Sequence, residues 1–373
     1  MNYSKLEWRK RFQKHYAELP VLGLAVDLSR IDVDDAFFAA MEPQIHQVFA
    51  DMAELEKGSV ANPDQYPMIR LYWLRDPALA PTPEIRKQTD PTLDKIMEYS
   101  AKVHVGKIRG GGGPFKNHIL IGIRASIPSP RFVAYALIDP RTDKPKPFIF
   151  DNADPDSLDR ALAAASLDLN RTLSITIPKS HPAKENLNGM LISKPSFDKT
   201  RFDPGQHSMA VNTQGSEPGE YATAPKWLPT SPIWDSVAGR TSEPSTVGLL
   251  LASLQRPDTD ALLSGAKAFN EFMTNYNVTL NQTSQHSVGS HDSGNVTVSN
   301  IMIVRPHKDI SEVFIRFIQK LLMESLGKLF NFNKHDVTQN NSILGNKGST
   351  FQQSYLQSLI CLMNSFYCQL LKL

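Results

Sequence analysis

The sequence predicts an α/β protein in which parallel sheets are covered by helices on both faces. Two observations support this fold class. From residue 117 onward, short apolar runs bounded by turn-forming residues alternate with helical stretches. The chain has 373 residues, 41% of them hydrophobic and 21% charged, which is typical of globular domains with a buried core. A chain of this length suggests two domains.

The N-terminal segment, residues 1–100, is predicted to be helical. Apolar residues recur there at spacings of three and four, which places them on one helical face. This apolar stripe consists of Phe37, Met41, Ile45, Val48, Met52 and Leu55. Pro43 lies within the stripe and predicts a kink. Thr82-Pro83-Glu84 predicts the start of another helix, with Thr82 as its cap.

The first α/β domain is predicted over residues 101–276. Its strands are predicted at residues 117–123, 148–150, 172–177 and 208–213. Helical stretches are predicted at residues 132–137, 156–167 and 187–192. Buried strands that alternate with helices in this way indicate a parallel sheet.

A second, shorter domain is predicted over residues 301–373. It contains an apolar strand at 301–304, a helix over 311–328 and a candidate strand at 366–371. The chain ends at Leu373 inside that last apolar run, so we expect this domain to be incomplete. The connection at 277–300 has Asp292 as its only formal charge and is rich in polar residues, which predicts poor order.

The composition argues against several classes of function. Forty basic and 38 acidic residues give a formal charge of +2 without a charged block, which argues against nucleic-acid binding. Cys361 and Cys368 are too few for a disulfide framework, and the charged N-terminus lacks a signal-peptide pattern, so we expect a cytoplasmic protein. The uncharged residues 352–371 contain Gln, Ser and Asn and do not predict a membrane anchor.

Two further segments predict no cofactor or metal site. Residues 110–113 are four glycines that lack the Gly-Lys-Ser/Thr of a phosphate-binding P-loop, so we expect a flexible loop. His286, His291 and Asp292 lie in the polar connection, where a solvated segment is the simpler interpretation than a metal site.

Two loops are candidates for a phosphate site. Residues 122–126, with Ser126, follow the first strand, and residues 178–182, with Lys179 and Ser180, follow the third. Ligands of parallel sheets bind at the carboxyl ends of strands, where helix N-termini present unpaired N–H groups. Neither loop is rich in glycine, so on the loops alone a simple connection is the favoured interpretation.

Several longer motifs occur in a recognisable order. They are Tyr72–Pro77 (YWLRDP), Asp151–Pro155 (DNADP), Asn188–Met190 (NGM), Gly239–Glu243 (GRTSE), Met323–Lys328 (MESLGK) and Gly345–Thr350 (GNKGST). In order and spacing they resemble the glucose-6-phosphate isomerase family, in its bacterial and plastid-type branch, over roughly residues 5–373. The resemblance implies two sugar-isomerase (SIS) domains, a homodimer with composite active sites, and a sugar-phosphate substrate. It implies isomerisation of glucose 6-phosphate and fructose 6-phosphate without a metal or cofactor.

The resemblance also implies roles for two residues. An aldose–ketose isomerase needs a carboxylate base for proton transfer between C1 and C2, and Glu324 matches the family's base. The enediolate intermediate needs a fixed positive charge, and Arg240 matches the family's arginine. From the local sequence alone, Glu324 can instead be a surface residue paired with Lys320 or Lys328, and Arg240 an ordinary surface or salt-bridge arginine.

The candidate phosphate loops depart from the family pattern. Arg124-Ala125 replaces two glycines ahead of Ser126, so two Cβ atoms stand where backbone N–H groups should approach the phosphate. In the second loop, Pro178 removes a hydroxyl group and an N–H donor, which leaves Lys179 and Ser180 as phosphate contacts. We therefore expect a lowered affinity for phosphate.

The residues that the resemblance implies for ring opening and proton transfer depart further from the family pattern. Gln353 stands in place of the family's histidine and cannot titrate near neutrality. Lys320 replaces a glutamine beside the base, and its charge would make Glu324 a weaker base. The resemblance also implies a catalytic lysine in a C-terminal segment beyond Leu373. The sequence thus predicts a catalytically impaired isomerase or, alternatively, a noncatalytic sugar-phosphate-binding or dimerising relic.

Overall fold

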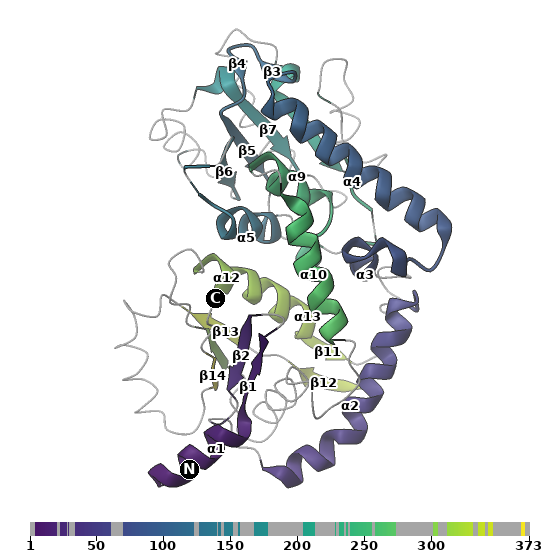
Figure 1. The fold of residues 1–373 in the computed structure, drawn as a ribbon, viewed down its shortest axis with the longest axis vertical. Helices are drawn as coiled ribbons and strands as arrows, with labels where there is room; N and C mark the ends of the chain where they lie inside the picture. Colours follow the sequence, from purple (N-terminus) through teal and green to yellow (C-terminus); the bar gives the residue numbers. More distant parts are fainter. Residues whose placement is uncertain are drawn as a thin grey trace. The chain divides into compact units, whose positions relative to one another are not determined.

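The fold comes from a computed structural model (Figure 1). The structure describes residues 4–20, 23–27, 29, 34–60, 70–122, 127–139, 141–142, 145–151, 156, 168–177, 204–212, 228, 231–234, 236–237, 239–255, 258–273, 301–304, 312–330, 335–339, 342–345 and 367–369. These residues belong to two compact units, one formed by 56–264 and the other by 1–55 with 265–373. The predicted helix at 187–192, all but the first residue of the predicted helix at 156–167, and the predicted poorly ordered connection at 277–300 lie outside the described residues. The predicted domain boundaries stay predictions.

The unit of residues 56–264 contains a five-stranded sheet with the order β6-β5-β7-β8-β9. Every neighbouring pair of these strands is parallel, which confirms the predicted α/β fold. The strands are β5 (Asn117–Ile121), β6 (Lys146–Phe150), β7 (Thr172–Thr176), β8 (Ser208–Asn212) and β9 (Ser231–Pro232). The first four agree with the sequence prediction. β9 was not predicted, because a two-residue edge strand that contains proline has no apolar pattern.

Three helices build the core on one face of this sheet. They are α4 (Pro83–His104), α5 (Pro128–Ala136) and α9 (Thr246–Gln255), and α9 packs against both α4 and α5. Every residue of α9 is buried, so this helix is surrounded by protein. The predicted start of α4 is confirmed, because the Thr82 hydroxyl accepts a hydrogen bond from the Ile85 amide at 3.4 Å. The core contains Leu120, Leu173, Ile175, Leu250 and Leu254.

The glycines at 110–113 form a hairpin, so the prediction of a flexible loop is wrong. β3 (Arg109–Gly110) pairs with β4 (Gly113–Pro114). The Gly111 amide donates to Nε2 of His207 at 3.1 Å, and the Gly112 amide donates to a backbone carbonyl at 2.9 Å. A Cβ atom at Gly110 would lie 2.4 Å from the His207 ring, so this position requires glycine for close packing.

The unit of residues 1–55 and 265–373 begins with α1 (Lys5–His15), the hairpin of β1 (Tyr16–Leu19) and β2 (Leu24–Asp27), and α2 (Asp35–Glu56). The hairpin corrects the prediction of an all-helical N-terminal segment. Gly23 provides its turn, with φ of 63° and a hydrogen bond from its amide to the Pro20 carbonyl.

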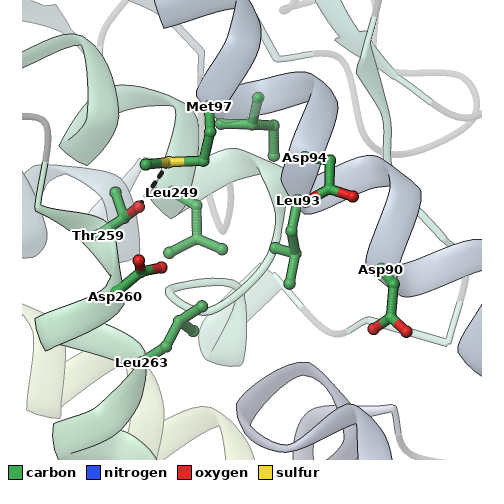
Figure 2. A pocket seen from close by; sticks show the side chains of 9 residues that line it. Asp90, Leu93, Asp94, Met97, Leu249, Thr259, Asp260 and Leu263 are labelled. Atoms are coloured by element: carbon green, nitrogen blue, oxygen red, sulfur yellow. Dashed lines mark hydrogen bonds between the residues drawn. The ribbon is translucent and has the colours of Figure 1, made fainter. Parts of the chain in front are cut away.

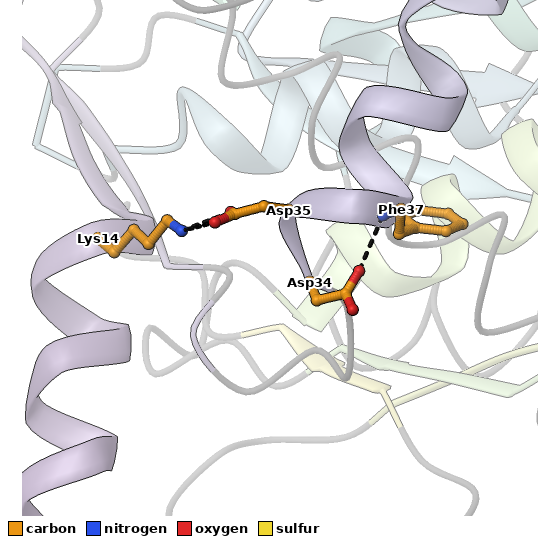
Figure 3. A network of polar contacts seen from close by, with 4 residues as sticks. All are labelled: Lys14, Asp34, Asp35 and Phe37. Carbon is orange, nitrogen blue, oxygen red and sulfur yellow. Dashed lines mark hydrogen bonds and ion pairs between the residues drawn. The ribbon is translucent and has the colours of Figure 1, made fainter.

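The start of α2 is fixed by two aspartates (Figure 3). The Asp34 carboxylate accepts a hydrogen bond from the Phe37 amide at 2.8 Å, as an N-cap does, and Asp35 forms an ion pair with Lys14 of α1. The helix continues through Pro43, and its apolar face packs Phe37, Phe38, Met41 and Met52 around Ile45 and Phe49.

The same unit contains a second parallel sheet with the order β13-β10-β14. Its strands are β10 (Ile301–Val304), β13 (Ser342–Gly345) and β14 (Tyr367–Gln369). The predicted strands at 301–304 and 366–371 are confirmed, whereas β13 was not predicted. A continuous helical segment consists of α12 (Glu312–Ile318), a π-helical turn (Gln319–Met323) and α13 (Glu324–Leu326), followed by the antiparallel pair β11 (Lys328–Phe330) and β12 (Asp336–Gln339).

Further helical segments in the described part of the chain are α3 (Leu71–Arg75), α10 (Thr259–Met273) and the 3₁₀ turns η2 (Pro77–Leu79), η4 (Leu169–Arg171), η5 (Pro204–His207) and η6 (Gly239–Thr241). Within the described residues, the structure contains no helix whose length and apolar character would allow it to span a membrane.

Candidate functional site

The topology of the first sheet creates a switch point between β5 and β7. From β5 the chain passes to β6 on one side, and it then returns to the other side of β5 as β7. The register places Ile121 beside Thr176, and the Ile177 amide donates to the Ile121 carbonyl at 3.0 Å. The strands β5 and β7 therefore end side by side. Ligands of open parallel sheets bind at this kind of position, outside the carboxyl ends of the strands.

The two predicted phosphate loops start at this switch point. Gly122 directly follows β5, and Ile177 directly follows β7. Because β5 and β7 are neighbours in the sheet, the two loops leave from adjacent strand ends. The predicted contacts themselves, Ser126, Lys179 and Ser180, lie outside the described residues.

An ion pair at the same edge of the sheet was not predicted. Arg131, in the second turn of α5, pairs with Asp151, which directly follows β6. The sequence contained a hint, because Asp151 is the first residue of the Asp151–Pro155 motif and follows a predicted strand. The pair holds the start of α5 next to the edge from which the first loop leaves.

Arg240 lies on the turn η6, which precedes the buried helix α9. The carbonyl oxygen of Gly239 accepts two hydrogen bonds, one from the Ser129 hydroxyl at 3.0 Å and one from the Ser242 hydroxyl at 2.8 Å. Ser129 belongs to α5 and is completely buried. The backbone next to Arg240 is thus tied to the helix that starts at the switch point.

The residues after Arg240 are packed tightly against α9. The Ser245 hydroxyl donates to the Ser242 carbonyl at 2.7 Å, and both serines are buried. A Cβ atom at Gly248 would lie 2.1 Å from the Glu243 carbonyl oxygen, so only glycine allows the helix to approach this closely. This explains why the motif around Arg240 continues into a helix with glycine in its first turn.

Glu324 lies in the other unit, at the start of α13 directly after the π-helical turn. It forms an ion pair with Lys320, one helical turn earlier, and both side chains are about one third exposed, at 38% and 32%. The local sequence offered Lys320 and Lys328 as partners of Glu324, and the structure shows the pair with Lys320. The π-helical geometry of this turn is uncommon and is frequently found at functional sites.

The helical segment that carries Glu324 is anchored to the second sheet. Ile315, Ile318 and Leu322 pack against Val304 and Ile343 of β10 and β13. The Gln319 side chain donates to the Ile343 carbonyl at 2.8 Å. The helix is therefore held against this sheet by residues just before Lys320 and by Leu322, which lies between Lys320 and Glu324.

The structure thus brings together Lys320 and Glu324 in one unit and describes Arg240 in the other. Gln353 lies outside the described residues. Sequence reasoning missed Ser129 and Glu243, although Glu243 was part of the Gly239–Glu243 motif. Serine in an ordinary helical pattern has no feature that marks it as a contact of a distant turn.

A pocket of about 260 Å³ lies elsewhere in the first unit, between α4, α9 and α10 (Figure 2). Its lining combines apolar side chains with three aspartates: Asp90, Leu93, Asp94, Ile96, Met97, Leu249, Thr259, Asp260 and Leu263. The Thr259 hydroxyl donates to the Met97 sulfur at 2.7 Å. Arg240 does not line this pocket. Within the described part of the chain, no three His, Cys, Asp or Glu side chains are close enough together to hold a metal ion.

Comparison with known sequences identifies relatives over almost the whole chain. The sequence profile of the family described as phosphoglucose isomerase matches residues 75–363. A glucose-6-phosphate isomerase of Geotalea daltonii is 39% identical over 365 residues, which are 98% of this chain and 69% of the relative. One of Trichormus variabilis is 39% identical over 370 residues, which are 99% of this chain and 70% of the relative. The chain therefore spans about seven tenths of the length of these relatives.

Comparison with solved structures supports the fold. A glucose-6-phosphate isomerase of Chlamydia trachomatis superposes with a TM-score of 0.82 at 20% identity, over 94% of this chain and 68% of that protein. A hypothetical protein of Thermus thermophilus superposes with a TM-score of 0.68 at 19% identity, over 90% of this chain and 72% of that protein. Together with the sequence matches, these similarities agree with the family expected from the motifs. The chain belongs to the glucose-6-phosphate isomerase (phosphoglucose isomerase) family.

Proposed function

We propose that the chain binds hexose 6-phosphates and interconverts glucose 6-phosphate and fructose 6-phosphate, at a rate reduced relative to its family. The observation that carries this proposal is the Gly239–Ser242 turn. It holds the family's arginine, and two hydrogen bonds to the Gly239 carbonyl fix its backbone in a chain that matches the family over residues 75–363.

The proposed reaction proceeds through an enediolate. The phosphate group is bound where the loops leave β5 and β7, with Ser126, Lys179 and Ser180 as its contacts. Glu324 removes the proton from C2 of the open-chain aldose and returns it to C1, while the hydroxyl proton passes from O2 to O1, so that the carboxylate ends each cycle in its starting state. The guanidinium of Arg240 stabilises the negative charge on the enediolate oxygens. No metal or cofactor takes part.

The reduced rate follows from two residues. Lys320 forms an ion pair with Glu324, and this pairing must be broken or weakened before the carboxylate can act as a base. Gln353, in place of a titratable histidine, cannot transfer a proton during ring opening. We therefore propose that the open-chain sugar is the better substrate.

The experiment is a coupled assay of fructose 6-phosphate isomerisation with the purified chain. Glu324→Gln should lower turnover by roughly a hundredfold or more, because a glutamine cannot accept the proton. Glu312→Gln, at the start of α12, is the matched control and should have little effect. Lys320→Gln should raise turnover, since it removes the ion pair and introduces the residue that the family resemblance implies. Turnover of the wild type no higher than that of Glu324→Gln would rule out the isomerase.

A noncatalytic sugar-phosphate-binding protein is the second candidate, and the Lys320–Glu324 ion pair favours it, since the pair occupies the proposed base. Calorimetry with fructose 6-phosphate distinguishes the candidates. Binding heat without turnover supports the binding protein. If neither binding heat nor turnover is observed, the dimerising relic remains, and light scattering should then show a homodimer.

We propose a cytoplasmic homodimer for the active form as well. The family resemblance supports the dimer, because it implies sites composed of residues from both subunits. Two cysteines in 373 residues are typical of proteins in a reducing compartment. Light scattering that gives the mass of one chain, with turnover retained, would contradict the dimer.

A further inference from the structure

Arg70 is a buried arginine that contacts the residues just ahead of Arg240 in the chain. The residue is 8% exposed. Its Nε donates to the Ser236 hydroxyl oxygen at 3.0 Å, and its backbone amide donates to the Ser236 carbonyl at 3.3 Å. The guanidinium carbon lies 4.6 Å from the ring centroid of Trp234, as in a cation–π contact. Ser236 precedes Arg240 by four positions, so Arg70 grips the segment that leads to it.

The other side of Arg70 is attached to two helices. Nη2 donates to the side-chain carbonyl of Gln88, which belongs to α4, at 3.0 Å. The Arg70 carbonyl accepts hydrogen bonds from the amides of Trp73 and Leu74, both at 3.1 Å, and these bonds begin α3. Trp73 and Leu74 are each 1% exposed. Arg70 therefore connects the segment ahead of Arg240 to helices that pack in the core of the same unit.

No ion pair accounts for the burial of this charge. Among the described residues, no charged group acts on the pKa of Arg70, which burial lowers. Its Nη1 is buried and has no hydrogen-bond partner. A buried cation with an unsatisfied N–H group lowers the stability of the fold. Packing alone would favour an apolar residue at position 70, and departures of this kind are expected near functional sites.

The turn that carries Arg240 is held on both sides. Before it, the Val237 amide donates to the Trp234 carbonyl at 3.0 Å, which closes the turn that Arg70 contacts, and Val237 is 2% exposed. At the turn itself, two serine hydroxyls donate to the Gly239 carbonyl. A single residue separates Val237 from Gly239, so a shift of the first turn is passed to the second.

We propose that Arg70 is a positioning residue for the proposed reaction: through Trp234 and Ser236 it fixes the approach to the Gly239–Thr241 turn, and with it Arg240. A guanidinium suits this role because it stacks on a ring and donates in two directions within one plane, which a lysine ammonium does not. The expected effect on turnover rests on the proposed role of Arg240. The expected effect on the backbone does not.

The first test compares arginine variants of the whole chain, using kcat and KM for fructose 6-phosphate. Arg70→Ala should lower kcat by about tenfold or more with a smaller change in KM, because Arg240 is then misaligned with the enediolate. Arg70→Lys should show a similar loss, since it keeps the charge but not the geometry. Arg86→Ala is the matched control on α4, because Arg86 is 58% exposed, and it should have little effect. A wild-type kcat in Arg70→Ala or Arg70→Lys would overturn the proposal.

The second test uses serine variants, in case Arg70→Ala does not fold. Ser236→Ala removes the acceptor of Arg70 Nε and should lower kcat in the same way, though less. Ser253→Ala is the matched control, since it removes a buried hydroxyl of α9 that bonds to Ser100 instead. Equal losses of kcat in the two serine variants would indicate general packing and overturn the proposal.

Hydrogen exchange of the backbone amides does not involve activity, so it separates failure of this proposal from failure of the proposed function. In Arg70→Ala, the amides of residues 236–241 should exchange faster, whereas those of α5 and α9 should keep wild-type rates. Arg86→Ala should match the wild type throughout. If the wild type lacks turnover but this local change is present, the link through Arg70 stands and only the isomerase role fails. Unchanged exchange at 236–241, or an equal increase across residues 56–264, would show that the proposal is wrong.

Discussion

In the sheet of β5 to β9, apolar side chains pack on both faces. In the sheet of β10, β13 and β14, the described apolar side chains pack on the face that the helical segment covers. On the first sheet, Leu120 and Ile175 belong to the core beneath α4, α5 and α9, and Ile119 and Ile121 pack with other apolar side chains on the opposite face. On the second sheet, Val304 and Ile343 pack against the helical segment. Leu344, the next residue of β13, is 43% exposed.

The described strand side chains of the two sheets therefore differ in burial. Both sheets are parallel, and parallel sheets in globular proteins are usually covered on both faces. The proposed phosphate loops and Arg240 are built on the fully packed sheet, which suits groups that must be held in place. The proposed base Glu324 lies on the helical segment that packs against β10 and β13.

Truncation of one leucine in each sheet should show the largest contrast between the sheets. Leu120 is fully buried, so Leu120→Ala should lower the free energy of unfolding by about 2–5 kcal/mol through lost burial and a cavity. Leu344→Ala should change it by no more than about 0.5 kcal/mol, because its side chain remains exposed to water. Urea denaturation, followed by circular dichroism, measures both. A loss at Leu344 as large as that at Leu120 would show that the second sheet is covered in solution.

A glycine substitution tests the close packing of the first unit. Gly110→Ala should destabilise the protein by about 1–3 kcal/mol, because the new methyl group would collide with the His207 ring. Gly265→Ala in α10 is the matched control. Nothing lies within 4 Å of the point that an alanine methyl group would occupy there, so alanine should stabilise the helix by about 0.5–1 kcal/mol. Thermal unfolding of both variants gives the comparison, and a tolerated Gly110→Ala would argue for a loose hairpin.

His118, on β5, should make the stability of the first sheet dependent on pH. Burial lowers its pKa to about 3, and neither ring nitrogen has a hydrogen-bond partner. The unfolded chain binds a proton at this residue near pH 6.5 but the folded chain does not, so stability should fall by about 1.4 kcal/mol per pH unit below pH 6.5. His118→Leu should remove this component. Parallel pH profiles of the two proteins would show that His118 gains a partner in solution.

The smallest effect is expected at the surface of the other unit. Lys14 and Asp35 form an ion pair, but their side chains are 54% and 73% exposed. Lys14→Ala should therefore lower the free energy of unfolding only slightly, and about 1 M salt should remove the difference. A larger, salt-independent loss would mean that the contact between α1 and α2 depends on packing of the lysine stem.

Much of the architecture followed from the sequence because strands β5, β6, β7, β8 and β10 are short segments rich in apolar and β-branched residues, as buried parallel strands are. The start of α4 followed from Thr82 and Pro83, whose effects are local. The hairpin of β1 and β2 did not follow, since its strands are only four residues long and lie between two helices. Strand β13 (SILG) was not predicted because only two of its four residues are apolar, whereas β10 (IMIV), of the same length, is apolar throughout.

For the candidate site, the sequence determined the residue types at 240, 320 and 324 and the strand ends from which the two loops leave. Only the tertiary structure decided which neighbours those residues have. Lys320 pairs with Glu324 because a helical turn separates them, but the tie between Ser129 and Gly239 joins residues 110 positions apart. Periodicity and motifs report local geometry, whereas a buried hydrogen bond between distant segments depends on how the helices pack on the sheet.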